Sequence, residues 1–335
     1  MAEWLHEDGI GEARAALVDA GHIIEAAIEP DDEGPRAGAI VPARLARIVQ
    51  PGRRAIATLE GGGEALIEPP PPGVTEGARL LVEISRSAVI EPGRGKRAVA
   101  RPAAPGTLPM PGPDLLARIT ATGIPVRRLS SHGADELEAA GWSELLDEAA
   151  TGEIAFPGGA LRLSLTPAMS LFDVDGTLAP AELAVAGARA AARAIRRMGI
   201  TGSIGIDLPT VAGRNERQAA ALAFDAELPQ PFERTAVNGF GFLQVICRRA
   251  RPSLPELLRG EPAAAAARAL LRQAERASGA GLLRITAAPT VIAAIEARPD
   301  WQAELGRRRG LGIALRTDPS LAISAGHVHV GLIET

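Results

Sequence analysis

The pattern of apolar and polar positions predicts strands and helices in alternation along most of the chain. Residues 169–174 form an apolar run with Asp173 near its end, an Ala-rich helical stretch follows over 180–198, and a second apolar run, 203–206, ends at Asp207. A strand, a crossover helix and a second strand place two parallel strands in one sheet, with their carboxyl ends on the same edge. We therefore expect Asp173 and Asp207 to converge.

Carboxylates in these positions predict a metal site. No Cys or His lies beside Asp173, Asp175 or Asp207, and carboxylate oxygens of this kind suit Mg²⁺ or Mn²⁺ rather than zinc. The alternative is that the aspartates only cap turns and helices. Two features favour a functional site: Asp173 interrupts an apolar strand, and Asp207 follows one directly.

The first hundred residues carry short β-type segments. Two alternating runs joined at residues 19–22 predict a β-hairpin. Four further segments, separated by Gly and Pro clusters, predict a small barrel: 38–49, 54–59, 64–67 and 78–84.

The remaining segments predict an α/β protein of several subdomains. Helices are expected over 134–148, 215–227 and 263–278, and a strand over 160–165. The last part should form a small α/β unit from the segments 282–287, 290–297 and 312–316, ending in a strand with His327 and His329. These two histidines have no apparent third ligand for a metal, so we expect a structural role for them.

Composition narrows the class of protein. The chain has 335 residues, 46% of them hydrophobic and 3% aromatic, and it lacks both an apolar leader segment and an apolar run long enough to span a membrane. This predicts a cytoplasmic protein without a membrane partner. The one cysteine, Cys247, excludes a disulfide framework and a Cys-rich zinc site. The formal net charge of −4 means that local basic clusters must make any contacts to phosphates.

One local motif suggests a different enzyme class. The sequence LFDVDGTL, residues 171–178, matches the nucleophile motif of haloacid-dehalogenase-like phosphatases. That mechanism also needs a lysine downstream and a later acidic loop, whereas the only lysine, Lys96, lies upstream. We keep this phosphatase as a third alternative.

The wider pattern resembles the ribonuclease E/G family. The resemblance is carried by Phe172-Asp173-Val174-Asp175, Arg193, Gly202-Ser203-Ile204-Gly205-Ile206-Asp207, Phe240-Gly241-Phe242-Leu243 and residues 248–254, RRARPSL. In that family the first and last aspartates of this pattern bind catalytic magnesium. Three positions depart from it: Asp175 replaces an Asn, Gly239 replaces an Arg, and Thr210 replaces a second Asp.

The resemblance implies a domain organisation in family order. It comprises an RNase H-like subdomain (1–35 and 112–165), an inserted S1-type OB barrel (36–100), a proline-rich connector (101–113) in place of the family's 5′ sensor, a DNase I-like catalytic subdomain (166–260) and a small C-terminal domain (263–335). The Cys-Pro-x-Cys link that pairs protomers through zinc in larger relatives is absent, so no zinc-linked dimer is expected.

The resemblance also implies a magnesium-dependent endoribonuclease that cleaves single-stranded RNA. Asp173, Asp175 and Asp207 would be catalytic, with Asp173 and Asp207 as the metal ligands. The predicted RNA-binding residues are Arg94, Lys96, Arg97, Arg193, Arg248, Arg249 and Arg251, although a solvated or salt-bridged surface is an equal alternative for these basic clusters.

A catalytically weak or inactive relative that binds RNA or associates with the ribosome is the second hypothesis, because the three departures favour reduced activity. The barrel segment 36–100 has no Phe, Tyr or Trp with which to stack bases. Phe240 and Phe242 are two residues apart, and we expect both to pack in the core.

Overall fold

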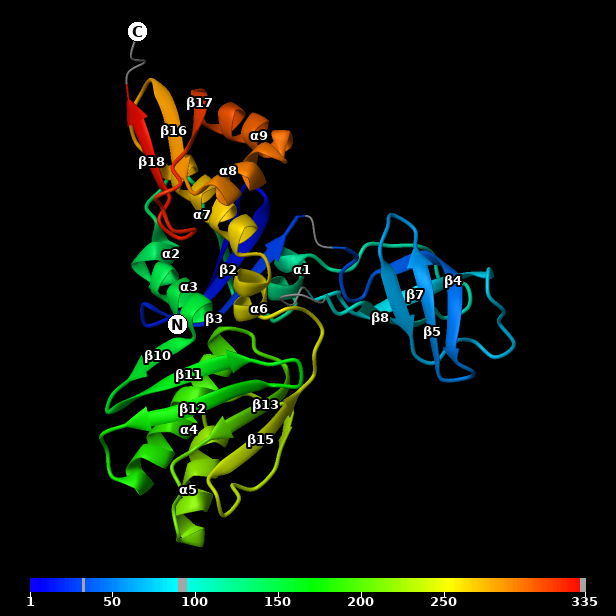
Figure 1. Cartoon of the computed structure of the whole chain (residues 1–335), viewed down its shortest axis with the longest axis vertical. Helices are drawn as coiled ribbons and strands as arrows, with labels where there is room; N and C mark the ends of the chain where they lie inside the picture. The colour runs from blue at the N-terminus through cyan, green and yellow to red at the C-terminus, as the bar shows by residue number, and fades with distance from the viewer. Residues whose placement is uncertain (32–33, 90–94, 332–335) are drawn as a thin grey trace.

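The computed structural model describes residues 1–31, 34–89 and 95–331 as a mixed α/β protein with several sheets and a closed barrel (Figure 1). This confirms the predicted fold class. In the view of Figure 1 the barrel projects sideways from the body, a six-stranded sheet lies at the bottom and the C-terminal unit at the top. Predicted Arg94 lies outside the described residues. The assignment of each unit to an RNase H-like, OB or DNase I-like fold stays a prediction.

The first sheet contains the predicted hairpin. Its order is β3-β2-β1-β9, with β9 parallel to β1 and the other pairs antiparallel. The turn between β2 and β3 consists of Ala20 and Gly21, whose φ angles are 49° and 82°; positive φ at both positions suits a two-residue hairpin turn. The strands are β1 (Glu3–Asp8), β2 (Glu12–Asp19), β3 (His22–Pro30) and β9 (Val126–Arg128), and helix α1 (Leu115–Thr120) packs on them.

The predicted barrel is confirmed and gains a fifth strand, β8. The four predicted segments form β4 (Ile40–Gln50), β5 (Arg54–Leu59), β6 (Glu64–Ile67) and β7 (Arg79–Arg86), and β8 (Ala98–Pro102) closes the barrel between β6 and β7. The first two residues of the predicted connector therefore belong to β8. The connector also touches the barrel again, since Met110 pairs with Ile40.

The six-stranded sheet has the order β10-β11-β12-β13-β15-β14. The predicted boundary at residue 165 leaves β10 and β11 in the preceding subdomain, whereas in the structure β11 pairs with β12 and both strands belong to this sheet. The strands are β10 (Glu153–Phe156), β11 (Gly159–Leu165), β12 (Ser170–Gly176), β13 (Gly202–Asp207), β14 (Phe232–Arg234) and β15 (Phe242–Cys247).

Helix α4 (Pro180–Arg197) contacts both the six-stranded sheet and the first sheet. Together with α5 (Arg214–Asp225) it packs on one face of the six-stranded sheet, and it also touches β3 of the first sheet. Small side chains allow this close packing: a Cβ on Gly187 would lie 2.4 Å from Cγ1 of Val174 on β12. The predicted helix over 134–148 is broken at Gly141, which has a φ of 94°; it forms α2 (Glu136–Ala139) and α3 (Trp142–Thr151).

The C-terminal unit has its own core and a three-stranded sheet, β17-β16-β18. Its elements are α7 (Pro262–Arg276), β16 (Leu282–Ala287), α8 (Pro289–Glu296), α9 (Pro299–Arg309), β17 (Gly312–Thr317) and β18 (His327–Gly331), and α6 (Leu254–Gly260) leads into it. The small α/β unit was predicted, but α9 was not. His327 and His329 share the exposed face of β18.

Buried ion pairs fasten this unit to the first sheet. The side chain of Arg14 is 1% exposed and binds Glu7 at 2.5 Å and Glu12 at 2.7 Å. From α7, Arg268 binds Glu12 at 2.9 Å and Arg272 binds Glu7 at 2.9 Å. We call these five residues the buried ion network. Each carboxylate in it has more than one arginine partner, as buried charge requires.

Candidate functional site

Asp173 and Asp207 lie side by side in the structure. Strands β12 and β13 are parallel neighbours, and their register places Asp173 opposite Asp207. Asp175 lies two residues further along β12, so it shares their face of the sheet. The convergence predicted from the sequence is confirmed at the level of strand register.

The three aspartates point away from the helices. Residues on β12 alternate, with Phe172 and Val174 buried under α4 and the aspartates exposed on the opposite side. Figure 1 shows α4 and α5 lying behind this sheet. We call the side without these helices the open face. It also carries Arg162 and Glu153, which pair with each other at 3.2 Å.

The aspartates have no competing partner in the part of the chain that the structure describes. Among the described residues, no hydrogen bond or ion pair engages the carboxylates of Asp173, Asp175 or Asp207. The same part of the chain contains no group of three or more His, Cys, Asp and Glu side chains arranged to hold a metal ion. Mg²⁺ often binds through only one or two carboxylates, with water and substrate phosphate completing its shell. Exposed hard oxygen donors on adjacent strands therefore fit such an ion.

An exposed aromatic residue stands next to the aspartates. Phe240 is 83% exposed, so the prediction that it packs in the core is wrong. A tight turn holds it out: the side chain of Asn238 accepts hydrogen bonds from the backbone N–H groups of Phe240 at 2.9 Å and Phe242 at 3.0 Å. The hydroxyl of Thr210 also donates to the Phe240 carbonyl at 3.1 Å, which ties this turn to the loop after Asp207.

Phe242 lies on the open face, half-buried, and not in the core as predicted. Its strand position is opposite Asp207. A Cβ on Gly205 would lie 2.6 Å from the Phe242 ring and 3.1 Å from both Leu171 and Met169. The missing side chain at Gly205 therefore makes room for a small apolar patch, Met169, Leu171 and Phe242, beside the aspartates.

The predicted RNA-binding residues are dispersed. Arg193 lies on α4, behind the sheet, and binds Glu227 through two hydrogen bonds of 3.0 and 2.9 Å. Arg97 binds Glu64 of the barrel at 2.5 Å. Neither is brought to the aspartates. Arg248 follows β15, exposed and without a hydrogen bond or ion pair among the described residues, and Arg251 is exposed beyond it.

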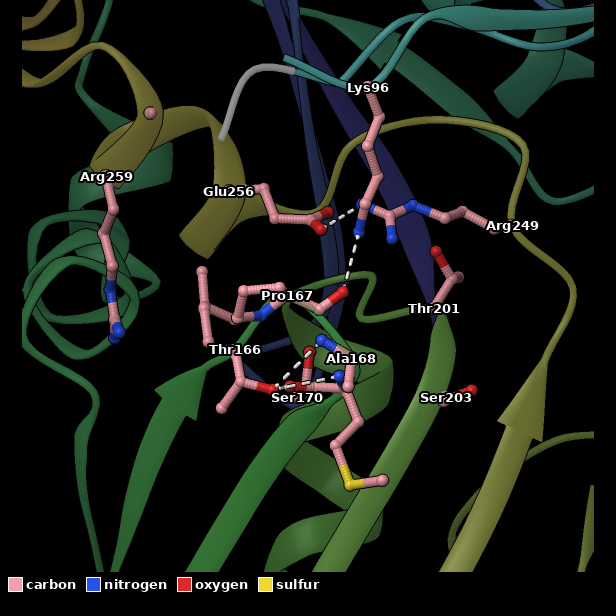
Figure 2. Close-up of a pocket in the computed structure, with 13 residues that line it drawn as sticks. Lys96, Thr166, Pro167, Ala168, Ser170, Thr201, Ser203, Arg249, Glu256 and Arg259 are labelled. Carbon is pink, nitrogen blue, oxygen red and sulfur yellow. Dashed lines mark hydrogen bonds and ion pairs between the residues drawn. The ribbon is translucent and has the colours of Figure 1, made fainter. Parts of the chain in front are cut away.

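Lys96 and Arg249 do come together, at the other end of the strands. Lys96 reaches from the segment between β7 and β8 to the body, where its amine donates to the carbonyl of Pro167 at 3.4 Å. Figure 2 shows its side chain beside that of Arg249, which pairs with Glu256. Their proximity could not be predicted from the sequence, because more than 150 residues separate the two in the chain.

The pKa values of Cys247 and Arg259 indicate which charge each side chain carries at neutral pH. Burial raises the pKa of the Cys247 thiol on β15, so this cysteine stays protonated at neutral pH and is a poor nucleophile. Burial lowers the pKa of Arg259 on α6. Even so, an arginine remains charged at neutral pH.

Comparison with known proteins adds no family: the chain matches no protein-family model and no curated protein. In the part of the chain that the structure describes, no helix is long and apolar enough to cross a membrane.

Proposed function

We propose that this protein is a metal-dependent endoribonuclease that hydrolyses single-stranded RNA on the open face of its six-stranded sheet. The observation that carries the proposal is the register of β12 and β13, which aligns Asp173 with Asp207 where neither has a protein partner among the described residues. Unpaired carboxylates held together on rigid strands are the arrangement that a divalent cation needs.

The residues of the chain divide the work. Asp173 and Asp207 bind Mg²⁺ or Mn²⁺, which when bound supplies Lewis acidity toward the scissile phosphodiester. In this proposal Asp175 accepts a hydrogen bond from the attacking water and orients it. Hydrolysis adds the water oxygen to phosphorus, breaks the bond from phosphorus to the leaving ribose oxygen, and returns a proton to that oxygen.

The surroundings of the aspartates favour a single strand as the substrate. Exposed Phe240 and half-buried Phe242 offer ring faces on which unpaired bases can stack. Arg248, which follows β15, offers a charge for a backbone phosphate. The aromatic residues that the barrel lacks are thus supplied by the sheet itself.

The test is cleavage of a labelled single-stranded RNA with Mg²⁺, with Mn²⁺ and with EDTA. We expect cleavage with either ion and none with EDTA. Cleavage that persists in EDTA, or no cleavage with either ion, would refute the proposal.

Binding of RNA without cleavage is the second candidate. One observation favours it: the described residues offer two aligned carboxylates and no group of three metal-binding side chains. In that case RNA would bind and remain intact with every ion. The phosphatase alternative gains no support, because Lys96 lies near Pro167, at the opposite end of β12 from Asp175. Turnover of p-nitrophenyl phosphate would be its signature.

A further inference from the structure

A polar cavity lies at the far end of the open face. A cavity of about 170 Å³ is formed where the segment carrying Lys96, the starts of β12 and β13, and helix α6 meet. Figure 2 shows its lining, in which hydroxyl groups and cations predominate. The polar side chains around it are those of Lys96, Thr166, Ser170, Thr201, Ser203, Arg249, Glu256 and Arg259.

Several buried donors in this cavity have no protein acceptor. The hydroxyl of Thr201, Nε of Arg249 and one terminal nitrogen of Arg259 are each buried without a hydrogen-bond partner among the described residues. Buried donors are nearly always satisfied in native proteins, by protein, water or ligand. Three in one cavity are available to a ligand with several acceptor oxygens.

The charge of the cavity is positive. Lys96, Arg249 and Arg259 line it together with one carboxylate, Glu256. Two nitrogens of Arg259 donate to the backbone carbonyls of Ala149 at 3.0 Å and Leu163 at 3.1 Å. The Glu256 carboxylate is already engaged: one oxygen accepts from Arg249, and the other accepts from the backbone and the hydroxyl of Ser253, each at 2.8 Å. Glu256 therefore fixes the guanidinium of Arg249, and the cavity keeps a net positive charge.

We propose that this cavity binds a phosphate group. A phosphate offers several strong acceptor oxygens and negative charge, which match the unsatisfied donors and the three cations. The same chemistry could come from a backbone phosphate of a nucleic acid or from a free phosphate or phosphomonoester. The backbone source rests on the proposed function, whereas phosphate binding by the cavity does not.

The position of the cavity favours the backbone source. Met169 lines both the cavity and the apolar patch beside Phe242, and Ser203 lies on the open face of β13. Ser170 precedes Asp173 by three residues, so at the rise of a β-strand the cavity lies on the order of 10 Å from the aspartates. A single-stranded RNA bound at Asp173 and Asp207 can therefore pass over Phe242 and place a further backbone phosphate in the cavity.

The experiment measures binding by calorimetry, in EDTA, for two probes: inorganic phosphate and an RNA octamer with hydroxyl groups at both ends. The background is the Asp173→Asn variant, so that cleavage plays no part. Thr201→Val removes the unpaired hydroxyl at nearly constant shape, and Lys96→Gln removes a charge. Arg249 is left in place, because its removal would leave Glu256 buried without its ion partner.

We expect both variants to bind phosphate at least about tenfold more weakly, equivalent to about 1.4 kcal/mol. The control substitution, Arg307→Gln, alters an arginine on α9 that is 72% exposed. The control protein should bind phosphate as tightly as the parent, which is the Asp173→Asn variant without a further substitution. A parallel loss of octamer affinity assigns the backbone source, and an unchanged octamer affinity assigns a free phosphate. No phosphate binding by the parent, or equal binding by both variants, overturns the proposal.

Discussion

The buried ion network and the aspartates of the open face differ in burial and in pairing. The buried ion network between the first sheet and α7 excludes water, and each of its carboxylates contacts two or more arginines. The aspartates of the open face are exposed, aligned and without partners among the described residues. Charges that are neutralised inside the protein hold it together, whereas charges left unpaired on a rigid surface are available to a ligand. The difference separates charges that are neutralised within the fold from charges that a ligand can reach.

The largest effect should come from breaking the buried ion network. Glu7→Gln removes a charge that Arg14 and Arg272 contact at 2.5 and 2.9 Å, and it leaves both arginines underpaired in the interior. Removal of one partner from a buried pair typically costs about 3 to 5 kcal/mol. Urea unfolding should show a loss of this size. The matched change in an exposed pair, Arg307→Gln, should alter the unfolding free energy by less than about 0.5 kcal/mol; equal losses would end the comparison.

The next largest effect should appear at the aspartates, and in activity instead of stability. Asp173→Asn and Asp207→Asn each remove a proposed metal ligand, so RNA cleavage should fall at least about a hundredfold. Because both side chains are exposed and unpaired, the urea midpoint should stay within error of the wild type. Asp175→Asn restores the residue that the ribonuclease E/G pattern carries, and it should be tolerated. Wild-type cleavage by both Asp173→Asn and Asp207→Asn would remove these two aspartates from the site.

A smaller effect is expected at Phe240. Its ring is 83% exposed, so Phe240→Ala should leave stability unchanged. If a base stacks on the ring, the substitution should weaken binding of single-stranded RNA by about 1 to 3 kcal/mol. Leu222→Ala on α5, at a side chain that is 57% exposed, is the control for loss of an exposed apolar group. Fluorescence anisotropy with a labelled oligonucleotide would measure both, and identical affinities would show that Phe240 does not touch RNA.

The strands and the sheet edge of the site could be predicted because their signals are local. Short β-type segments bounded by Gly and Pro predicted the barrel strands β4 to β7 to within a few residues of their ends. Two apolar runs ending in carboxylates predicted β12 and β13. The fifth barrel strand, β8, was missed because it follows the charged stretch around Lys96 and ends in a proline. Helix α9 was missed because only Trp301 and Leu305 of its residues are buried, too few to form an apolar stripe.

Other features of the site could not be predicted because they depend on tertiary contacts. The spacing of Phe240 and Phe242 predicted that both lie on the same face of one strand. Instead, the Asn238 side chain accepts a hydrogen bond from the Phe240 N–H and stabilises a turn in which Phe240 is exposed. The cavity proposed to bind phosphate joins Lys96, from the segment between β7 and β8, to Thr201 just before β13 and Arg249 just after β15. No stretch of sequence contains that combination, and single hydroxyl residues give no signal of their own.

The smallest expected effect concerns pH, and it again contrasts buried with exposed charge. His6 on β1 is buried, and burial lowers its pKa below the ordinary value of 6.5. Since its folded pKa is lower than its unfolded pKa, the unfolded chain binds the proton more readily. The stability contributed by neutral His6 is therefore complete above about pH 6.5 and is lost as the pH falls through the lower folded value.

Unfolding free energies measured in urea between pH 7.5 and 5 should thus decline for the wild type and decline less for His6→Asn. Exposed His132, in the loop before α2, supplies the control: His132→Asn should keep the wild-type slope. The ionised carboxylate of Glu7 also makes the unfolding free energy depend on pH, but in a lower range. Burial alone would raise the pKa of Glu7, but Arg14, Arg272 and Arg276 outweigh burial and lower it. The stability that this carboxylate contributes is therefore lost only as the pH falls below about 4.5. A wild-type slope in His6→Asn would show that another buried group causes the decline.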